Sequence, residues 1–195
     1  RQIQSRPVAI LASSREGEEA AWLAAWQAVS RSEPEVQWLI VPRHPQRVND
    51  VEALLQAQGL RVSRRSQWSD APEPADVWLG DSLGEMALYY SLSNVALLGG
   101  SFGPWGGQNL IEAAACACPV IMGPHTYNFT QAAKMAEQAG AALRVQDMGE
   151  AFKLGLHLLQ DQAGQTQVSK AALQFAQAHQ GAAQRTAQAV RDLIV

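Results

Sequence analysis

Residues 95–117 read VALLGGSFGPWGGQNLIEAAACA, and this stretch decides the fold. It begins with a four-residue apolar run, Val95–Leu98, that is predicted to form a buried strand. Five glycines follow within nine positions, 99 to 107, and a helix is expected from Asn109 to Ala117, ending before Pro119. A glycine-rich loop between a strand and a helix lets the backbone adopt positive φ and come close to a ligand.

The same alternation of strand and helix continues on both sides of this stretch. Further strands are predicted at 7–12, 36–41, 60–64, 77–79, 120–122 and 142–145. Helices are predicted after the 13–17 loop, at 48–58, from 85 through 92, at 129–139, and from 148 onward with breaks at Gly164 and Gly181. Strands that alternate with helices predict an α/β, Rossmann-like fold, with a mostly parallel sheet and helices on both faces. We expect residues 1–195 to form a single domain of this kind.

Each polar loop of the predicted fold comes directly after a strand. The carboxyl ends of parallel strands lie at one edge of the sheet, where ligands bind in open α/β folds. We therefore expect five loops to meet at one rim: Ser13–Glu19, Pro42–Pro45, Asp81–Glu85, Gly99–Asn109 and Gly123–Asn128. Trp22, Trp26 and Trp38 have the spacing of core residues, and Cys116 and Cys118 are interpreted as small core side chains.

The composition excludes several classes of protein. The chain has 195 residues, 47% of them hydrophobic, and a net charge of −3 without a basic block. These values argue against disorder, a membrane-spanning run and generic nucleic-acid binding. Two cysteines two residues apart suit neither a disulfide scaffold nor a structural zinc site, so a reducing compartment is expected. The sequence starts without Met, and we expect it to be a piece of a longer protein.

The glycine-rich loop carries the sharpest candidate for a ligand site. Glu112 is the only charged residue between Met86 and Ala133. The expected helix start near Asn109 would offer free N–H groups to a phosphate, and the Glu112 carboxylate could accept two hydrogen bonds from a ribose diol. Alternatively, Asn109 caps the helix and Glu112 stabilises its first turn, an arrangement that leaves the glycine density unexplained.

Other polar residues of the rim also have two interpretations. Arg43 and His44, between two prolines, could bind a phosphate or form a solvated turn. Gly84 with Glu85 could form a second binding group, or Glu85 could be a favourable charge in a first helical turn. His125 could donate to phosphate or bond to backbone. Glu16, Glu18 and Glu19 could be acids at a helix start, and Trp105 could cover a ligand or face a partner.

The sequence lacks a P-loop signature, a G-x-G-x-x-G after the first strand, an H-E-x-x-H and a metal-spaced cluster, so neither metal nor cofactor is expected.

Several blocks of sequence occur in the order typical of one family. They are VPRHP (41–45), LGEM (83–86) with Tyr89-Tyr90, GGS (99–101), GGQNLIEAAA (106–115), PVIMGPHTYNF (119–129) and the early SSREGEE (13–19). Together they resemble the carboxyl-terminal half of the 3-deoxy-D-manno-octulosonic acid (Kdo) transferases of lipopolysaccharide synthesis. The resemblance runs from about Pro7 to the C-terminus, and the 106–112 and 123–129 blocks are its most specific parts.

The resemblance implies a GT-B glycosyltransferase whose C-terminal Rossmann-like domain binds the donor CMP-Kdo. Arg43, Gly84, Glu85, Asn109 and Glu112 match the family's donor-site motifs; His44, Gly106 and Gly107 are included with them, and Ser101, His125 and Asn128 are possible sugar or phosphate contacts. Arg15 and Gln108 stand where the family usually has His, which leaves their roles open. No catalytic residue is expected in this chain. The general base, the site for the lipid A precursor and the membrane anchor are expected in an N-terminal domain that this sequence lacks, on an enzyme at the cytoplasmic face of the bacterial inner membrane.

Two alternatives remain beside this expectation. The chain could be the donor domain of another GT-B enzyme that uses a UDP-sugar, or a non-catalytic nucleotide-binding module. Alone it is expected to bind CMP-Kdo weakly, to catalyse nothing and to remain soluble.

Overall fold

The sheet of this protein is entirely parallel, as the alternation predicts. The computed structural model describes residues 6–29, 36–69 and 71–179, and in this part of the chain seven strands pair in the order β3-β4-β2-β1-β5-β6-β7. The strands are β1 (Val8–Ser14), β2 (Gln37–Pro42), β3 (Val62–Arg64), β4 (Val77–Leu79), β5 (Val95–Leu98), β6 (Val120–Met122) and β7 (Ala142–Arg144). Their bounds fall within two residues of the predicted ones, because each apolar run is bounded by polar, Gly or Pro residues.

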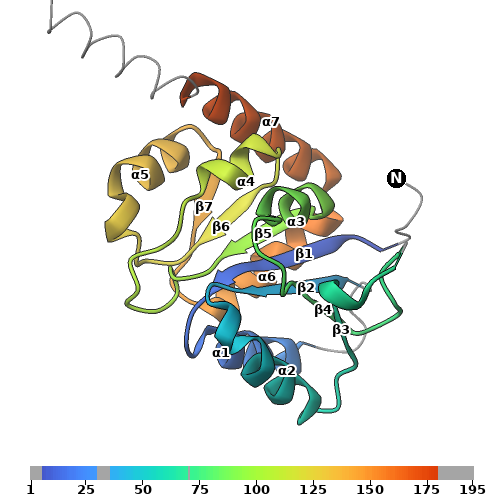
Figure 1. Cartoon of the computed structure of the whole chain (residues 1–195). Coiled ribbons are helices and arrows are strands. Elements are labelled where there is room, and N and C mark those ends of the chain that lie inside the picture. The colour runs from blue at the N-terminus through green and yellow to red at the C-terminus, as the bar shows by residue number, and fades with distance from the viewer. Residues whose placement is uncertain (1–5, 30–35, 70, 180–195) are drawn as a thin grey trace, which may run out of the picture.

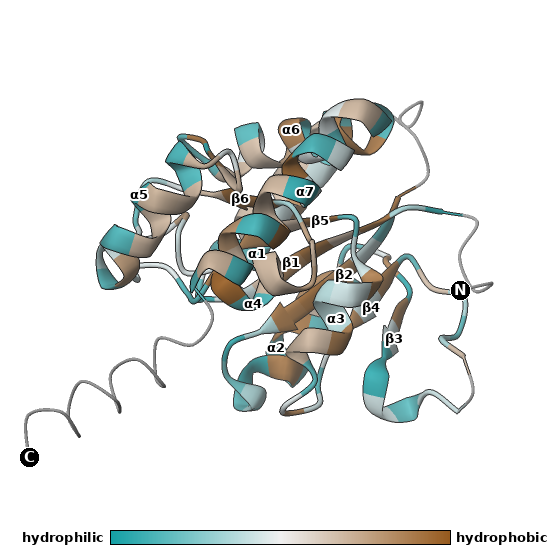
Figure 2. Ribbon diagram, turned by 90° about the horizontal axis from the view of Figure 1, so that it is seen from above, coloured by the Kyte–Doolittle hydropathy of each residue, from teal (hydrophilic) through white to brown (hydrophobic). Residues whose placement is uncertain are grey.

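Helices cover both faces of the sheet (Figure 1). They are α1 (Glu18–Ala28), α2 (Val48–Gln56), α3 (Met86–Leu92), α4 (Ile111–Ala115), α5 (Thr130–Gln138), α6 (Met148–Gln160) and α7 (Gln162–His179), with short 3₁₀ turns η1 (Pro45–Arg47), η2 (Arg65–Gln67) and η3 (Tyr127–Phe129). One core contains α1, α2 and α6, and the other contains α3, α4, α5 and α7. Alternate residues of each central strand enter opposite cores, which explains why the strands are hydrophobic throughout (Figure 2).

An aromatic cluster fills the core on the α1 side. The Trp38 ring stacks on Phe152 with centroids 4.7 Å apart, and Trp22 meets Trp38 edge-on at 5.3 Å. Trp22 and Trp38 are buried, as predicted. The prediction for Trp26 is wrong: its side chain is 37% exposed, since it lies one turn farther along α1 at the margin of the core. Cys118 is buried, whereas Cys116 is partly exposed.

Two predicted helix limits are wrong, and both errors come from local caps. The helix expected over 109–117 is limited to Ile111–Ala115, because Ala117 takes φ +55° and the Cys118 N–H reaches back to the Ala113 carbonyl at 3.0 Å. The break expected at Gly164 lies instead at Asp161, whose Oδ1 accepts from the Gly164 N–H at 3.0 Å and starts α7. The other predicted break, Gly181, lies outside the described residues.

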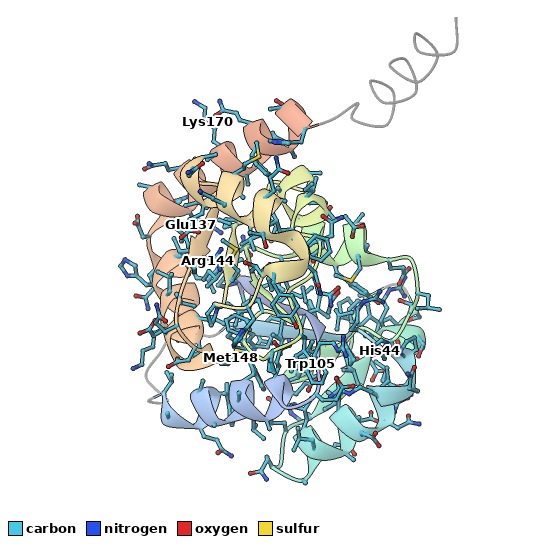
Figure 3. The ribbon with its side chains drawn as sticks, turned by 90° about the vertical axis from the view of Figure 1, so that its left-hand side faces the viewer. His44, Trp105, Glu137, Arg144, Met148 and Lys170 are labelled. Carbon is cyan, nitrogen blue, oxygen red and sulfur yellow. The ribbon has the colours of Figure 1, made fainter. Side chains whose placement is uncertain are left out.

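The topology switches direction at the middle of the sheet. From β1 the chain passes first to β2 on one side, and later β5 pairs with β1 on the other side. A crevice for a ligand is expected outside the carboxyl ends of β1 and β5 for this reason. All strands end at this edge, which faces the left of Figure 1 and the viewer in Figure 3. None of the described helices is long and apolar enough to cross a membrane.

Candidate functional site: the carboxyl rim

The five predicted loops lie at the carboxyl ends of the strands, as expected from an all-parallel sheet. We call these loops, 13–19, 42–45, 81–85, 99–109 and 123–128, the carboxyl rim. Backbone hydrogen bonds join several of them: the Arg43 N–H donates to the Ser14 carbonyl at 2.9 Å, and the His125 N–H donates to the Ser101 carbonyl at 3.0 Å. His44 and Trp105 both appear in the lower half of Figure 3, whereas Lys170 of α7 lies at the top.

Gly99–Asn109, the glycine-rich loop, folds back on itself. The Gly107 N–H donates to the Gly100 carbonyl at 2.7 Å, and Gly100, Gly106 and Gly107 all have φ between +71° and +85°. At Gly99 the loop touches β1, since a Cβ there would lie 2.5 Å from the Ser13 carbonyl oxygen. The glycine density is therefore required by left-handed turns and by close packing of backbone on backbone.

The β6–α5 loop is attached to the glycine-rich loop. The Asn128 side chain donates from Nδ2 to the Trp105 carbonyl at 3.0 Å, and its backbone N–H donates to the Gly106 carbonyl at 3.0 Å. The Tyr127 hydroxyl donates to the Pro104 carbonyl at 2.7 Å. Asn128 thus holds the loop in this structure, and its side-chain oxygen is the part that can still contact a ligand. His125 is half-buried beside it.

Ser101 supports the loop from below. It is fully buried, its hydroxyl bonds to the Leu98 carbonyl, and its Oγ accepts from the Gly123 N–H at 2.8 Å. These contacts connect the end of β5 to the end of β6. In this conformation Ser101 does not reach the surface that a sugar or phosphate would touch.

Asn109 and Glu112 stand at the start of α4. Asn109 Oδ1 accepts from the Ile111 N–H at 3.0 Å, so Asn109 does cap the helix, one residue before Leu110 at the N-cap position. Glu112 is exposed at the second helical position, and its carboxylate has no hydrogen-bonded partner among the described residues. The capping alternative therefore accounts for Asn109 but leaves the Glu112 carboxylate without a partner.

The charged side chains of Arg43 and Glu85 differ in whether they have partners. Arg43 is exposed, and its guanidinium has no hydrogen-bonded or ion-paired partner in the described part of the chain, although its backbone N–H bonds to Ser14. The Glu85 carboxylate instead accepts from Arg65 at 2.9 Å and from the Ser82 hydroxyl. The hydroxyl of Tyr89, whose pKa is raised by burial, contacts Ser82. Gly84, at φ +78°, makes the turn that precedes Glu85.

Sequence reasoning missed a buried carboxylate network at the start of α1. Glu18 and Glu19 are 3% and 1% exposed. Glu19 accepts from Ser14 Oγ at 2.6 Å and from both terminal nitrogens of Arg47, whereas Glu18 accepts from backbone amides of the glycine-rich loop. No pattern in SSREGEE distinguishes these buried acids from Glu16, which is exposed, since all three follow the end of β1 within five positions.

Arg15 and Trp105 form a second contact between loops of the rim. The Arg15 guanidinium lies 4.4 Å from the centroid of the Trp105 ring, and its Nε is 3.1 Å from a Glu16 carboxylate oxygen. Trp105 therefore packs against a loop of its own chain. Across the described residues there is no group of three or more His, Cys, Asp or Glu side chains placed to hold a metal ion.

The fold and the site define a class of protein: the C-terminal, Rossmann-like domain of GT-B glycosyltransferases. The C-terminal domain of the group 1 glycosyl transferase LpcC from Francisella tularensis has the same fold at 11% identity, with a TM-score of 0.58 over 89% of this chain and 85% of that one. The C-terminal CMP-Kdo binding domain of WaaA from Acinetobacter baumannii is 31% identical, with a TM-score of 0.83 over 90% of this chain and 91% of that one.

Curated relatives name the family. The 3-deoxy-D-manno-octulosonic acid transferase of Bordetella pertussis is 50% identical over 96% of this chain and 45% of its own length. The enzyme of the same name from Haemophilus influenzae is 35% identical over 93% of this chain and 43% of its own length. The chain belongs to the family of 3-deoxy-D-manno-octulosonic acid (Kdo) transferases, and it spans a little under half the length of these relatives. No protein-family model matches the sequence.

Proposed function

We propose that this chain binds CMP-Kdo and is the donor-binding domain of an enzyme that transfers Kdo to a lipid A precursor in lipopolysaccharide synthesis. The observation that carries the proposal is the match, at 31% identity, to nine-tenths of a solved domain described as CMP-Kdo binding. The 50% identity to a Kdo transferase over nearly the whole chain supports it.

Two unpaired charges, Arg43 on the carboxyl rim and Glu112 in the first turn of α4, suit the phosphate and the ribose of a nucleotide. Most other charged side chains of the rim are engaged: Glu18 and Glu19 are buried, and Glu85 is paired with Arg65. Glu112 and Arg43 have no such partner among the described residues. In the proposal the Glu112 carboxylate accepts hydrogen bonds from the ribose hydroxyls, and the Arg43 guanidinium binds the phosphate.

The remaining predicted residues shape the surface around these charges. Gly106 and Gly107 are buried and have left-handed backbone conformations before α4, Asn109 caps the start of α4, and Gly84 and Glu85 belong to the rim loop after β4. We propose that His44, His125 and Asn128 contact the phosphate or the sugar. Ser101 would support the glycine-rich loop without touching the donor, through its hydrogen bonds to Leu98 and Gly123.

The proposed chemistry is displacement at the anomeric carbon of Kdo. The bond from that carbon to the phosphate oxygen breaks, its electron pair remains on CMP, and an acceptor hydroxyl oxygen forms the new bond while losing its proton to a base. Arg43 and backbone amides would stabilise the charge that develops on the phosphate. We propose no residue of this chain as that base. The base, the acceptor site and attachment to the bacterial inner membrane are proposed for other parts of the whole enzyme.

A titration with three nucleotides tests the proposal. Isothermal calorimetry on the 195-residue chain should give the highest affinity for CMP, and lower affinities for UMP and ADP. HepE from Anabaena has this fold at 12% identity, over 95% of this chain and 47% of that one with a TM-score of 0.65, and was solved in complex with UDP and glucose. A preference for UMP would therefore favour a UDP-sugar donor, and binding of none of the three would reject a nucleotide site.

A further inference from the structure

The buried carboxylate of Glu18 joins two loops of the carboxyl rim. Glu18 is the first residue of α1, and its side chain reaches across to the glycine-rich loop. Oε2 accepts from the Gly100 N–H at 2.7 Å and from the Arg15 N–H at 2.8 Å, and Oε1 accepts from the Phe102 N–H at 3.0 Å. The Gly100 and Phe102 amides are therefore occupied by the protein itself and are not free to bind a donor phosphate.

A charge at this position is costly to the fold. Burial raises the pKa of Glu18, and the backbone N–H groups of Gly100, Arg15 and Phe102 partly offset that effect. A raised pKa means that ionised Glu18 is less favourable in the folded chain than in the unfolded one, so the carboxylate costs stability at neutral pH. A group kept in spite of such a cost is a candidate for a role in the site.

The contact lies where a ligand crevice is expected, and it extends to the residues proposed for donor binding. Ser13, in the loop that carries Glu18, has φ +55°, and Gly99 packs against its carbonyl. Gly100, which Glu18 holds by its N–H, accepts through its carbonyl from the Gly107 N–H. Gly106, next to Gly107, accepts from Asn128. One side chain thus fixes the first half of the glycine-rich loop, on which the second half rests.

We propose that Glu18 is a positioning residue for the donor: it holds Gly100 and Phe102 so that the segment from Gly106 to Glu112 keeps the conformation that receives the nucleotide. The inference rests on the proposed function, because its predicted effect is on CMP binding. It assigns no contact between Glu18 and the donor.

The neighbouring residue provides a matched control. Glu19 is also buried in the first turn of α1, but its carboxylate bonds to Ser14 and Arg47, and none of its hydrogen bonds reaches the described glycine-rich loop. Glu18→Gln and Glu19→Gln remove the same charge from the same turn. In Glu18→Gln the amide has a single acceptor oxygen, so the Gly100 and Phe102 N–H groups cannot keep separate acceptors.

The experiment measures three quantities on the 195-residue chain and its variants: the Kd for CMP, the Tm, and hydrogen–deuterium exchange of a peptide covering residues 99–103. Glu18→Gln should weaken CMP binding by about tenfold, as expected from the loss of one or two hydrogen bonds to a charged group, and should speed exchange in that peptide. Glu19→Gln should change the Tm but leave the Kd within about twofold of wild type. Glu18→Asp, which keeps the charge but is one methylene shorter, should resemble Glu18→Gln, and it replaces that variant if Glu18→Gln does not fold.

Each contrary result has one meaning. Wild-type affinity for CMP in both Glu18 variants, or equal losses in Glu18→Gln and Glu19→Gln, would overturn the positioning role. Absence of CMP binding by the wild-type chain would instead overturn the proposed function, and the exchange measurement would still show whether Glu18 holds the loop. Unchanged exchange in the 99–103 peptide would contradict the role in either case.

Discussion

At the scale of single residues, four of the five glutamates in or beside the carboxyl rim, all except Glu16, show how the same charge can have different surroundings. Glu18 and Glu19 are buried and bonded to the protein, and Glu85 is paired with Arg65. Glu112 is exposed, and its carboxylate has no hydrogen-bonded partner among the described residues. Because a carboxylate accepts hydrogen bonds and cannot donate them, Glu112 is the one of these four best suited to bind a diol.

Replacing Glu112 should therefore weaken nucleotide binding without affecting the fold. Glu112→Ala is expected to lose about 1–3 kcal/mol of CMP binding free energy, the range for hydrogen bonds to a charged group. Calorimetric titration with CMP measures the loss. Glu73→Ala is the control, since Glu73 is also exposed but lies in the loop before β4, at the opposite edge of the sheet. Equal affinities in the two variants would return Glu112 to a role at the helix start.

A second prediction concerns the ion pair at the edge of the sheet. The Asp76 carboxylate accepts from the Arg61 backbone N–H at 2.8 Å and from its guanidinium at 2.9 and 3.1 Å, and this holds the pKa of Asp76 below its ordinary value of 3.8. A lowered pKa in the folded state stabilises the fold above that ordinary value, and this contribution is lost as the pH falls through the folded-state pKa.

Asp76→Asn should accordingly be less stable than wild type at pH 7, by an amount that shrinks as the pH falls below 3.8. Urea unfolding of both proteins across that range gives the difference. Other groups, such as Glu16 and Glu18, titrate in both proteins, so their effects cancel in the difference to first order. If the difference in free energy of unfolding between the two proteins stays constant with pH, lost packing and not lost charge accounts for the lower stability of Asp76→Asn.

At the scale of elements, the glycine-rich loop depends on Gly106. Gly106 has φ +85°, and a Cβ there would lie 2.3 Å from Asn128 Nδ2 and 2.6 Å from a Tyr127 ring carbon. Gly106→Ala must therefore displace Asn128 and break its hydrogen bond to the Trp105 carbonyl. We expect a stability loss above the roughly 1–2 kcal/mol of a left-handed alanine, together with weaker CMP binding.

Gly59→Ala is the matched variant for this prediction. Gly59 has φ +77° at the end of α2, and nothing lies within 4 Å of its Cβ position. It should show the conformational cost alone, with CMP affinity unchanged. Thermal unfolding and calorimetry on both variants separate the backbone cost of a left-handed alanine from the effect of displacing Asn128. Equal losses of Tm and equal CMP affinities in the two variants would show that Asn128 does not hold the loop.

Sequence patterns were sufficient for the order and direction of these elements but not for their caps. The strands and the five rim loops follow from apolar runs bounded by polar, Gly or Pro residues, which are local signals. The early end of α4 depends on Ala117 adopting φ +55°, and alanine is not the residue that usually does so. The start of α7 depends on Asp161, whose capping of Gly164 outweighs the tendency of glycine to interrupt a helix.

The contacts between loops were beyond prediction for a different reason. Glu18 and Gly100 are 82 positions apart, and their meeting depends on β5 pairing with β1 at the centre of the sheet. The sequence SSREGEE indicates acids at a helix start, which is correct, but it does not distinguish the carboxylate that points to the glycine-rich loop from the one that pairs with Arg47. Long-range pairing of strands therefore determines which charges of the rim remain available.

At the scale of the whole molecule, two hydrophobic cores lie on either side of the sheet, and the rim loops occupy one end of it. Loops from β1, β5 and β6 are joined by hydrogen bonds across that end. A ligand that binds these loops touches segments attached to both cores. Binding should therefore stabilise the domain as a unit, because a ligand that binds the folded state alone shifts the whole unfolding equilibrium.

CMP is accordingly expected to raise the Tm of the 195-residue chain. At a concentration about a hundredfold above its Kd, a ligand adds about 2.7 kcal/mol to the free energy of unfolding, which for a domain of this size corresponds to about 5–10 °C. Differential scanning fluorimetry with CMP, UMP and ADP gives the shifts, and the CMP shift should be the largest.

The same scans with EDTA test the prediction that no metal is needed: the CMP shift should persist, since Arg43 and backbone amides are proposed to hold the phosphate. A shift that vanishes with EDTA and returns with Mg²⁺ would mean that a cation takes part in binding.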